Sequence, residues 1–343
     1  MVLLRKLLFP LALIYGCVTA IRNFFYDQGW FKSNGFDVPV IVVGNLSVGG
    51  TGKTPMIEYL IRLLSEHYQV ATLSRGYKRQ TKGFILADAT ATAQTLGDEP
   101  FQIWQKFPDI QVAVDADRKN GIERLLSQNK KPQVILLDDA FQHRRVKAGF
   151  YILLTAYDDL FTDDVMLPTG NLRESKSGAI RANLIIVTKC PENLSEIARQ
   201  EIKDKMRKYK KDTVSVFFTS IAYDDVVCSK GTKRKVAEIK TQPKLLVAGI
   251  AKPKPFFAYL QRSGDIALTY PDHHDFSAQD IDNIKKQAVN QPIVTTEKDY
   301  VRLKDALPTD ALFYLPIKTS FVAQGNDFNQ IILNYVGTST TNR

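Results

Sequence analysis

The chain has 343 residues, and its 44% hydrophobic and 24% charged content is that of an ordinary globular protein with room for two cores. A formal net charge of +10 suits an anionic partner, such as phosphate, nucleic acid or an acidic bilayer surface, without choosing among them. The three cysteines form neither a disulfide framework nor a metal-ligand spacing, which favours a reducing compartment.

The N-terminal segment is apolar and has basic ends. Residues 7–21 carry no charge, Arg5 and Arg22 flank them, and Trp30 follows. Because a spanning helix needs about 20 apolar residues, we predict that residues 1–30 form a membrane-associated, interfacial helix. A secretory signal cleaved after Ala20 and a buried helix of the fold are the alternatives.

Residues 38–55 read as a buried strand that runs into a glycine-rich turn ending in Gly52-Lys53-Thr54. Such a turn binds nucleotide phosphates through its backbone N–H groups, its lysine and the dipole of the following helix, while the threonine hydroxyl holds magnesium. The residues predicted to bind nucleotide are Ser47, Val48, Gly49, Gly50, Thr51, Gly52, Lys53 and Thr54. Ser47 departs from the usual motif, which has glycine there.

Further apolar runs alternate with helical patterns as far as about Ser220. Continuous Val, Ile and Leu runs indicate strands buried on both faces, hence a parallel sheet between helices. The predicted strands are 40–43, 70–73, 112–114, 134–137, 151–154, 184–187 and 214–218. Ligands of such a sheet bind at the carboxyl ends of its strands.

Two acidic motifs fall at the edge formed by these carboxyl ends, which we call the rim. Asp138 and Asp139 end an apolar strand, as the magnesium-binding element of a phosphate-loop enzyme requires. Asp98, between Gly97 and Glu99, is our candidate for the base that accepts the proton of an alcohol, although a helix N-cap explains it equally well.

A basic patch at residues 229–235 predicts a hairpin or linker before a smaller α/β lobe. We place the boundaries at 31–222 for the phosphate-loop core, 223–236 for the linker hairpin and 237–343 for the second lobe. In that lobe, His273 and His274 lie between aspartates, where they could bind metal, move a proton or cap a helix.

Seven motifs in order resemble the tetraacyldisaccharide 4'-kinase family of lipid A biosynthesis, over nearly the full length. They are residues 44–55, 73–77, 97–100, 138–144, 170–174, 272–274 and 296–299. A hydroxyl residue commonly replaces the first loop glycine in this family, so Ser47 supports the resemblance. Four positions depart from it: the family usually has glycine at Lys78 and Ala140, and proline at Asn171 and Ser175.

The resemblance implies an α/β phosphate-loop protein with a second lobe, which transfers the γ-phosphoryl group of ATP to the 4'-hydroxyl of a tetraacyldisaccharide 1-phosphate and gives lipid IVA. It implies Asp98 as base, assisted by His273, with Lys53 at the phosphates. The magnesium ligands it implies are Thr54, Glu99, Asp138 and Asp139, and the basic residues we assign to the substrate are Arg75, Arg118 and Arg173.

The implied partners are the acylated disaccharide phosphate lipid and the cytoplasmic face of the bacterial inner membrane. No nucleic acid and no obligate protein partner is expected. Two other functions remain open from the residues alone: a soluble phosphate-loop enzyme acting on a small metabolite, and a nucleotide-gated membrane-docking protein.

Overall fold

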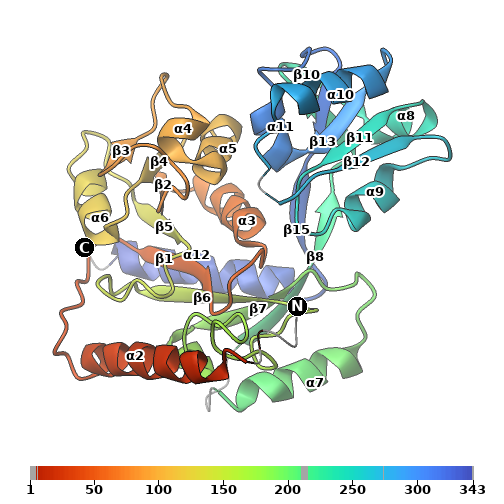
Figure 1. The fold of residues 1–343 in the computed structure, drawn as a ribbon. Coiled ribbons are helices and arrows are strands. Elements are labelled where there is room, and N and C mark those ends of the chain that lie inside the picture. Colours follow the sequence, from red (N-terminus) through yellow and green to blue (C-terminus); the bar gives the residue numbers. More distant parts are fainter. Residues whose placement is uncertain (1–4, 6, 210–214, 273, 342–343) are drawn as a thin grey trace. The chain divides into compact units, whose positions relative to one another are not determined.

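The computed structural model describes residues 5, 7–209, 215–272 and 274–341. Two compact units divide the chain: unit 1 is Met1–Ile221 with Thr319–Arg343, and unit 2 is Ala222–Lys318. Each is described by itself below (Figure 1).

Unit 1 is built on a sheet with the strand order β15-β8-β7-β6-β1-β5-β2-β4-β3. Its central strands β1, β2 and β4 to β8 pair in parallel, and β3 joins the edge antiparallel to β4. The strand bounds are β1 (Val40–Asn45), β2 (Val70–Ser74), β3 (Ile85–Leu86), β4 (Gln111–Val114), β5 (Val134–Asp138), β6 (Phe150–Ala156), β7 (Leu184–Thr188), β8 (Ser215–Tyr223) and β15 (Ile317–Phe321). The predicted parallel sheet is therefore present.

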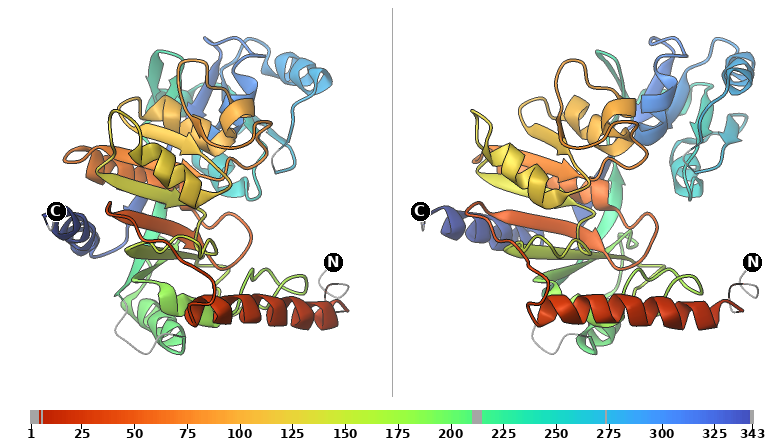
Figure 2. Two further views of the ribbon diagram at one scale, coloured as in Figure 1. Left: turned by 90° about the vertical axis from the view of Figure 1, so that its left-hand side faces the viewer. Right: turned by 60° about the vertical axis from the view of Figure 1, so that its left-hand side comes forward.

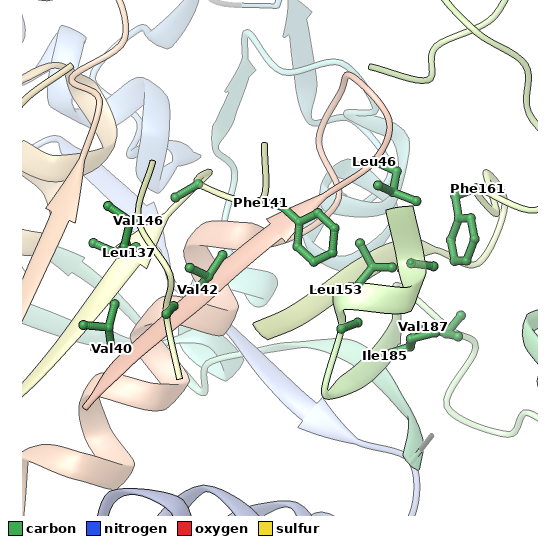
Figure 3. Close-up of a cluster of buried hydrophobic side chains, with 14 of the residues drawn as sticks. Val40, Val42, Leu46, Leu137, Phe141, Val146, Leu153, Phe161, Ile185 and Val187 are labelled. Carbon is green, nitrogen blue, oxygen red and sulfur yellow. The ribbon is translucent and has the colours of Figure 1, made fainter. Parts of the chain in front are cut away.

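Helices cover both faces of this sheet. Alternate residues of β1 enter different cores: Val40 and Val42 lie in one cluster (Figure 3), and Ile41 and Val43 lie in the other. The first core receives side chains from α6 (Arg118–Leu126) and α7 (Glu196–Arg207). The second receives them from α3 (Lys53–Ser65), α5 (Asp98–Lys106) and α12 (Gly325–Thr341). The short helix α4 (Ala93–Leu96) and the 3-10 helix η1 (Lys176–Arg181) complete the unit.

Unit 2 has a second sheet, with the order β10-β9-β14-β13-β11-β12. Its strands are β9 (Val226–Ser229), β10 (Thr232–Lys235), β11 (Leu245–Ala248), β12 (Ile266–Thr269), β13 (Ile293–Thr296) and β14 (Leu312–Leu315). Its helices are α8 (Val236–Thr241), α9 (Lys254–Leu260), α10 (Ala278–Ala288) and α11 (Glu297–Leu303).

The observed units differ from the predicted boundaries. Residues 223–236 do contain a hairpin, but β9 pairs with β14, so the hairpin is part of the unit 2 sheet rather than a linker. Residues from 319 onward return to unit 1 instead of ending the second lobe. The reason is apolar packing, because Phe328, Ile332 and Val336 of α12 are fully buried in a unit 1 core.

The N-terminal apolar segment forms α2 (Phe9–Asp27), a helix of 19 residues that runs along the outside of unit 1 (Figure 2). Ala12 is its one buried residue, so α2 is not the buried helix that the sequence left as an alternative. Polar contacts hold it to the unit: the Tyr15 hydroxyl donates to Arg173 O (3.0 Å), and Asn23 Nδ2 donates to Glu174 Oε2 (3.0 Å). By length and composition alone, α2 is long and apolar enough to cross a membrane, and a signal sequence near an N-terminus passes the same test.

Gly44 allows the close approach of β1 to the chain after β5. A Cβ atom at this position would lie 2.7 Å from Phe141 Cβ and 3.0 Å from Phe141 N. We predict that Gly44→Ala lowers the free energy of unfolding by about 1–3 kcal/mol through overpacking. Gly35→Ala is the control, since a Cβ there meets nothing within 4 Å. Urea denaturation measures both, and equal stability of the two variants would contradict this packing argument.

Candidate functional site

The glycine-rich loop leaves the carboxyl end of β1 and enters α3, as the sequence predicts. Gly49 (φ +113°) and Gly52 (φ +82°) adopt backbone conformations that favour glycine, and Gly52 is the N-cap of α3. Lys53 and Thr54 are thus the first residues of the helix, at its positive dipole end. The Thr51 hydroxyl is buried and has no hydrogen-bond partner among the described residues.

Two neighbouring segments hold this loop in place. Val48 N donates to Asn171 O (2.8 Å), and Arg173 N donates to Leu46 O (2.7 Å). From the end of β7, Thr188 Oγ1 donates to Thr51 O (2.8 Å), and Lys189 Nζ donates to Gly50 O. Main-chain atoms of the loop therefore make all four contacts, and a Cβ on Gly49 would meet nothing within 4 Å.

The acid pair lies directly beside the loop because β1 and β5 are parallel neighbours. Val43 is in register with Asp138, so both strands reach the same rim together. Asp139 (φ +48°) accepts two hydrogen bonds from Arg173, at 2.7 and 3.2 Å, and its Oδ1 lies 3.7 Å from Lys53 Nζ. An ionised carboxylate therefore connects the loop lysine with the arginine of the 170–174 motif.

The two carboxyl groups have opposite pKa shifts. Burial and, to a smaller extent, the charge of Glu99 raise the pKa of Asp138 to about 7, although Lys53 acts in the opposite direction. Burial also acts to raise the pKa of Asp139, but the hydrogen bonds from Arg173 and the charge of Lys53 outweigh it and lower that pKa. Asp138 Oδ1 is buried and unpartnered among the described residues, so it is the carboxylate oxygen with capacity left for a ligand.

Asp98 is the first residue of α5, and Gly97 (φ +91°) occupies the N-cap position in its place. Asp98 is therefore not the N-cap of this helix. Its side chain is half-buried and lies in the first helical turn. A Cβ on Gly97 would lie 2.8 Å from Tyr77 O, so this turn packs against the segment that follows β2. Glu99 is close enough for its charge to act on Asp138.

The three arginines assigned to the substrate differ in their surroundings. Arg75 is exposed just beyond β2. Arg173 is engaged with Asp139 and with Asn45 Oδ1. Arg118 is only 2% exposed and donates to Asp115 O (2.7 Å) and Asp138 O (3.2 Å), which leaves it almost no surface for a ligand. Burial lowers the pKa of Arg118 to about 10, so the guanidinium stays charged at neutral pH. It holds the main chain of Asp138 and has its charge close to both acids.

Of the two unit 2 histidines, His273 lies outside the described residues. His274 stacks on Tyr270, with ring centroids 5.0 Å apart, and its Nε2 is 3.0 Å from Asp280 Oδ2. Asp280 also accepts from Ser277, the N-cap of α10. His274 therefore supports the start of that helix, the capping role that the sequence left open.

No group of three or more His, Cys, Asp or Glu side chains is arranged to hold a metal ion within the described residues. A magnesium ion at the loop does not need such a group, because it is usually bound by one or two carboxylates, waters and substrate phosphates.

Sequence reasoning assigns no role to Asn45 or Gln142, although both organise the rim. Asn45 Nδ2 donates to Ser47 O (2.7 Å), and Gln142 Nε2 donates to Asn45 O (2.9 Å) and to Glu174 Oε1 (2.8 Å). Both residues fall inside the motifs quoted above. In the sequence, each is only an amide residue, at the end of β1 or in the turn after β5, and such a residue has many explanations.

Lys78 has φ +60°, a conformation that favours glycine. This is one of the positions at which the chain departs from the family that it resembles, and the backbone there still takes the glycine conformation.

Comparison with known proteins identifies the family. The sequence profile of "Tetraacyldisaccharide-1-P 4'-kinase" matches residues 4–337. The chain belongs to this family. It is similar to tetraacyldisaccharide 4'-kinases from Flavobacterium psychrophilum (63% identity over 339 residues, 99% of each chain) and Bacteroides fragilis strain YCH46 (44% over 360 residues, 99% of this chain and 95% of the relative).

The fold has a relative among solved structures. The crystal structure of LpxK from Aquifex aeolicus in complex with ATP has a TM-score of 0.78 and 28% identity, and the match covers 97% of this chain and 99% of that one. These findings confirm the predicted α/β fold class and the prediction of a kinase of lipid A biosynthesis. They set aside both a small-metabolite enzyme and a docking protein without catalytic activity.

The raised pKa of Asp138 predicts a pH effect on stability. Without metal or nucleotide, the folded state keeps the proton up to about pH 7, whereas an unfolded aspartate loses it near pH 4. The folded state thus binds more protons in this window, so this contribution to stability is lost as pH rises from about 4 to about 7.

Asp138→Asn should remove this dependence, which is at most about 1.4 kcal/mol per pH unit. Urea denaturation across the window, with chelator present, measures it. Parallel pH profiles for the wild type and the variant would contradict the assignment.

Proposed function

We propose that this chain phosphorylates the 4'-hydroxyl of a tetraacyldisaccharide 1-phosphate with ATP, giving lipid IVA, through the site that surrounds its glycine-rich loop. The observation that carries the proposal is the joint position of Lys53 and Asp139, 3.7 Å apart at the rim, in a chain of this kinase family. Phosphoryl transfer is mainly positioning and electrostatics, which such a rim provides.

ATP would lie with its phosphates against the backbone of residues 47–54. Gly49 and Gly52 have the positive φ values that a tight phosphate-binding turn favours, and the N-terminus of α3 adds positive potential. Lys53 would stabilise the β- and γ-phosphates. Its present neighbour Asp139 is shared with Arg173, so the carboxylate keeps a partner when the lysine turns to the nucleotide.

Magnesium would be held by Thr54 together with the acidic residues Asp138, Asp139 and Glu99, directly or through water. The unpartnered, buried Asp138 Oδ1 supports this, because such an atom is costly unless a ligand satisfies it. When bound, the ion would neutralise charge on the phosphates and would favour the ionised form of Asp138.

Asp98 would accept the proton of the sugar hydroxyl, assisted by His273. Its place in the first turn of α5, with Glu99 acting on Asp138, supports a base on the same rim as the phosphate loop. Arg75, which is exposed, and Arg173 would bind anionic groups of the substrate. Arg118 would instead hold the main chain of Asp138 in position.

The lipid would be presented at the membrane surface through α2, at the cytoplasmic face of the inner membrane. Large apolar side chains are exposed along the helix and just after it: Leu11, Leu13, Ile14, Val18, Ile21, Phe24 and Trp30. The contacts of Tyr15 and Asn23 with residues 173 and 174 support a helix that stays with the folded kinase rather than a cleaved signal.

Asp98→Asn tests the base directly. Turnover should fall by about 100-fold or more while ATP affinity stays near the wild-type value, because proton transfer is lost and the phosphate loop is intact. A kinase assay with the acylated disaccharide phosphate and calorimetric ATP titration measure the two quantities. Asp109→Asn, at an exposed carboxylate beyond α5, is the control, and wild-type turnover in Asp98→Asn would remove Asp98 from the mechanism.

Ile14→Gln/Val18→Gln tests membrane docking without removing the helix, since both side chains are exposed. Binding to vesicles of phosphatidylethanolamine and phosphatidylglycerol should weaken by about 10-fold or more, with ATP affinity unchanged. Ile197→Gln, at an exposed position of α7, is the matched control. Cosedimentation measures binding, and equal binding by the double variant and the wild type would contradict docking through α2.

A further inference from the structure

A buried carboxylate joins the phosphate-loop helix to the helix that carries Asp98. Glu58 of α3 is 2% exposed. Its Oε2 lies 2.7 Å from Lys106 Nζ and 2.9 Å from Arg62 Nη2, and its Oε1 accepts from Gln102 Nε2 (3.2 Å). Two of these three partners, Gln102 and Lys106, belong to α5.

The spacing of these residues relates them to the site. Glu58 follows Thr54 by four residues, and Gln102 follows Asp98 by four, so each lies on the same helix face as the site residue, one turn behind it. The Glu58–Gln102 hydrogen bond thus connects the two helices one turn away from their N-termini. A further contact joins them where α5 ends, since the Arg62 guanidinium lies 5.2 Å from the centroid of the Phe107 ring.

Stability alone does not require a carboxylate here. Glu58 is surrounded on α3 by buried apolar residues, and desolvating a charge costs free energy that a well-packed apolar side chain would avoid. A charged group with three directed partners does what an apolar one cannot, because it sets the distance and rotation between two helices.

We propose that Glu58 is a positioning residue for phosphoryl transfer, which holds the N-terminus of α5, and with it Asp98, at a set place beside the phosphate loop. Glu58 itself contacts neither nucleotide nor lipid and acts through Gln102 and Lys106. This inference rests on the proposed role of Asp98 as the base.

Glu58→Gln keeps the shape of the side chain and removes the charge that pairs with Lys106. Turnover at saturating substrate should fall about 10- to 100-fold, as for a base displaced by about 1 Å, while ATP affinity changes less than about threefold. Tyr59→Phe is the matched control on the same helix, since it removes the bond from Tyr59 to Asn329 Oδ1 of α12 (2.8 Å). It should lower the melting temperature and leave turnover of the folded protein unchanged.

Combination with Asp98→Asn separates positioning from general support. If Glu58 acts through Asp98, adding Glu58→Gln to Asp98→Asn should not reduce the residual turnover further. Wild-type turnover in folded Glu58→Gln, an equal loss of turnover and ATP affinity, or a full additional loss in the double variant would each overturn the proposal. Should Glu58→Gln not fold, Lys106→Met, alone and with Asp98→Asn, is judged by the same criteria.

The outcomes also separate this inference from the proposed function. Wild-type turnover in Asp98→Asn overturns the assignment of the base, and the role of Glu58 with it. A large loss in Asp98→Asn together with wild-type turnover in Glu58→Gln overturns only the role of Glu58.

Discussion

The parallel register of β1 with β5 is the constraint on which the rest of the site depends. Val43 pairs with Asp138, so the phosphate loop and the acid pair leave the sheet at the same level. A slip of one residue would turn each of these side chains to the other face of the sheet. Gly44 permits this neighbourhood, because the chain after β5 comes within 3 Å of where its Cβ would stand.

Charge at the rim is distributed unequally between the two acids. Asp139 is kept ionised by Arg173 and Lys53, whereas Asp138 is buried, faces Glu99 and holds its proton more tightly. The rim without ligands thus has one carboxylate already paired and one with an unpartnered oxygen. We interpret Asp139 as the partner that holds the loop lysine in place, and the unpartnered oxygen of Asp138 as a ligand for a cation.

The parts of the fold that local patterns encode could be predicted from the sequence. The apolar runs of β1 and β5 and the Gly52-Lys53-Thr54 turn are each readable within a few residues. Long-range packing could not be read in this way. Nothing local shows that α12 returns to unit 1, that Arg118 faces main-chain carbonyls rather than solvent, or that Glu58 meets Lys106 across 48 positions, because these depend on the assembled sheet.

The most direct measurement of the central claim is the fate of the terminal phosphate. The full-length protein is incubated with magnesium, γ-labelled ATP and a tetraacyldisaccharide 1-phosphate in mixed micelles, and the lipid products are separated and mapped. The account predicts one labelled lipid with the phosphate at the 4' position, formed in proportion to ADP. Label that remains in ATP or appears only as inorganic phosphate, or label at another position of the disaccharide, would contradict it.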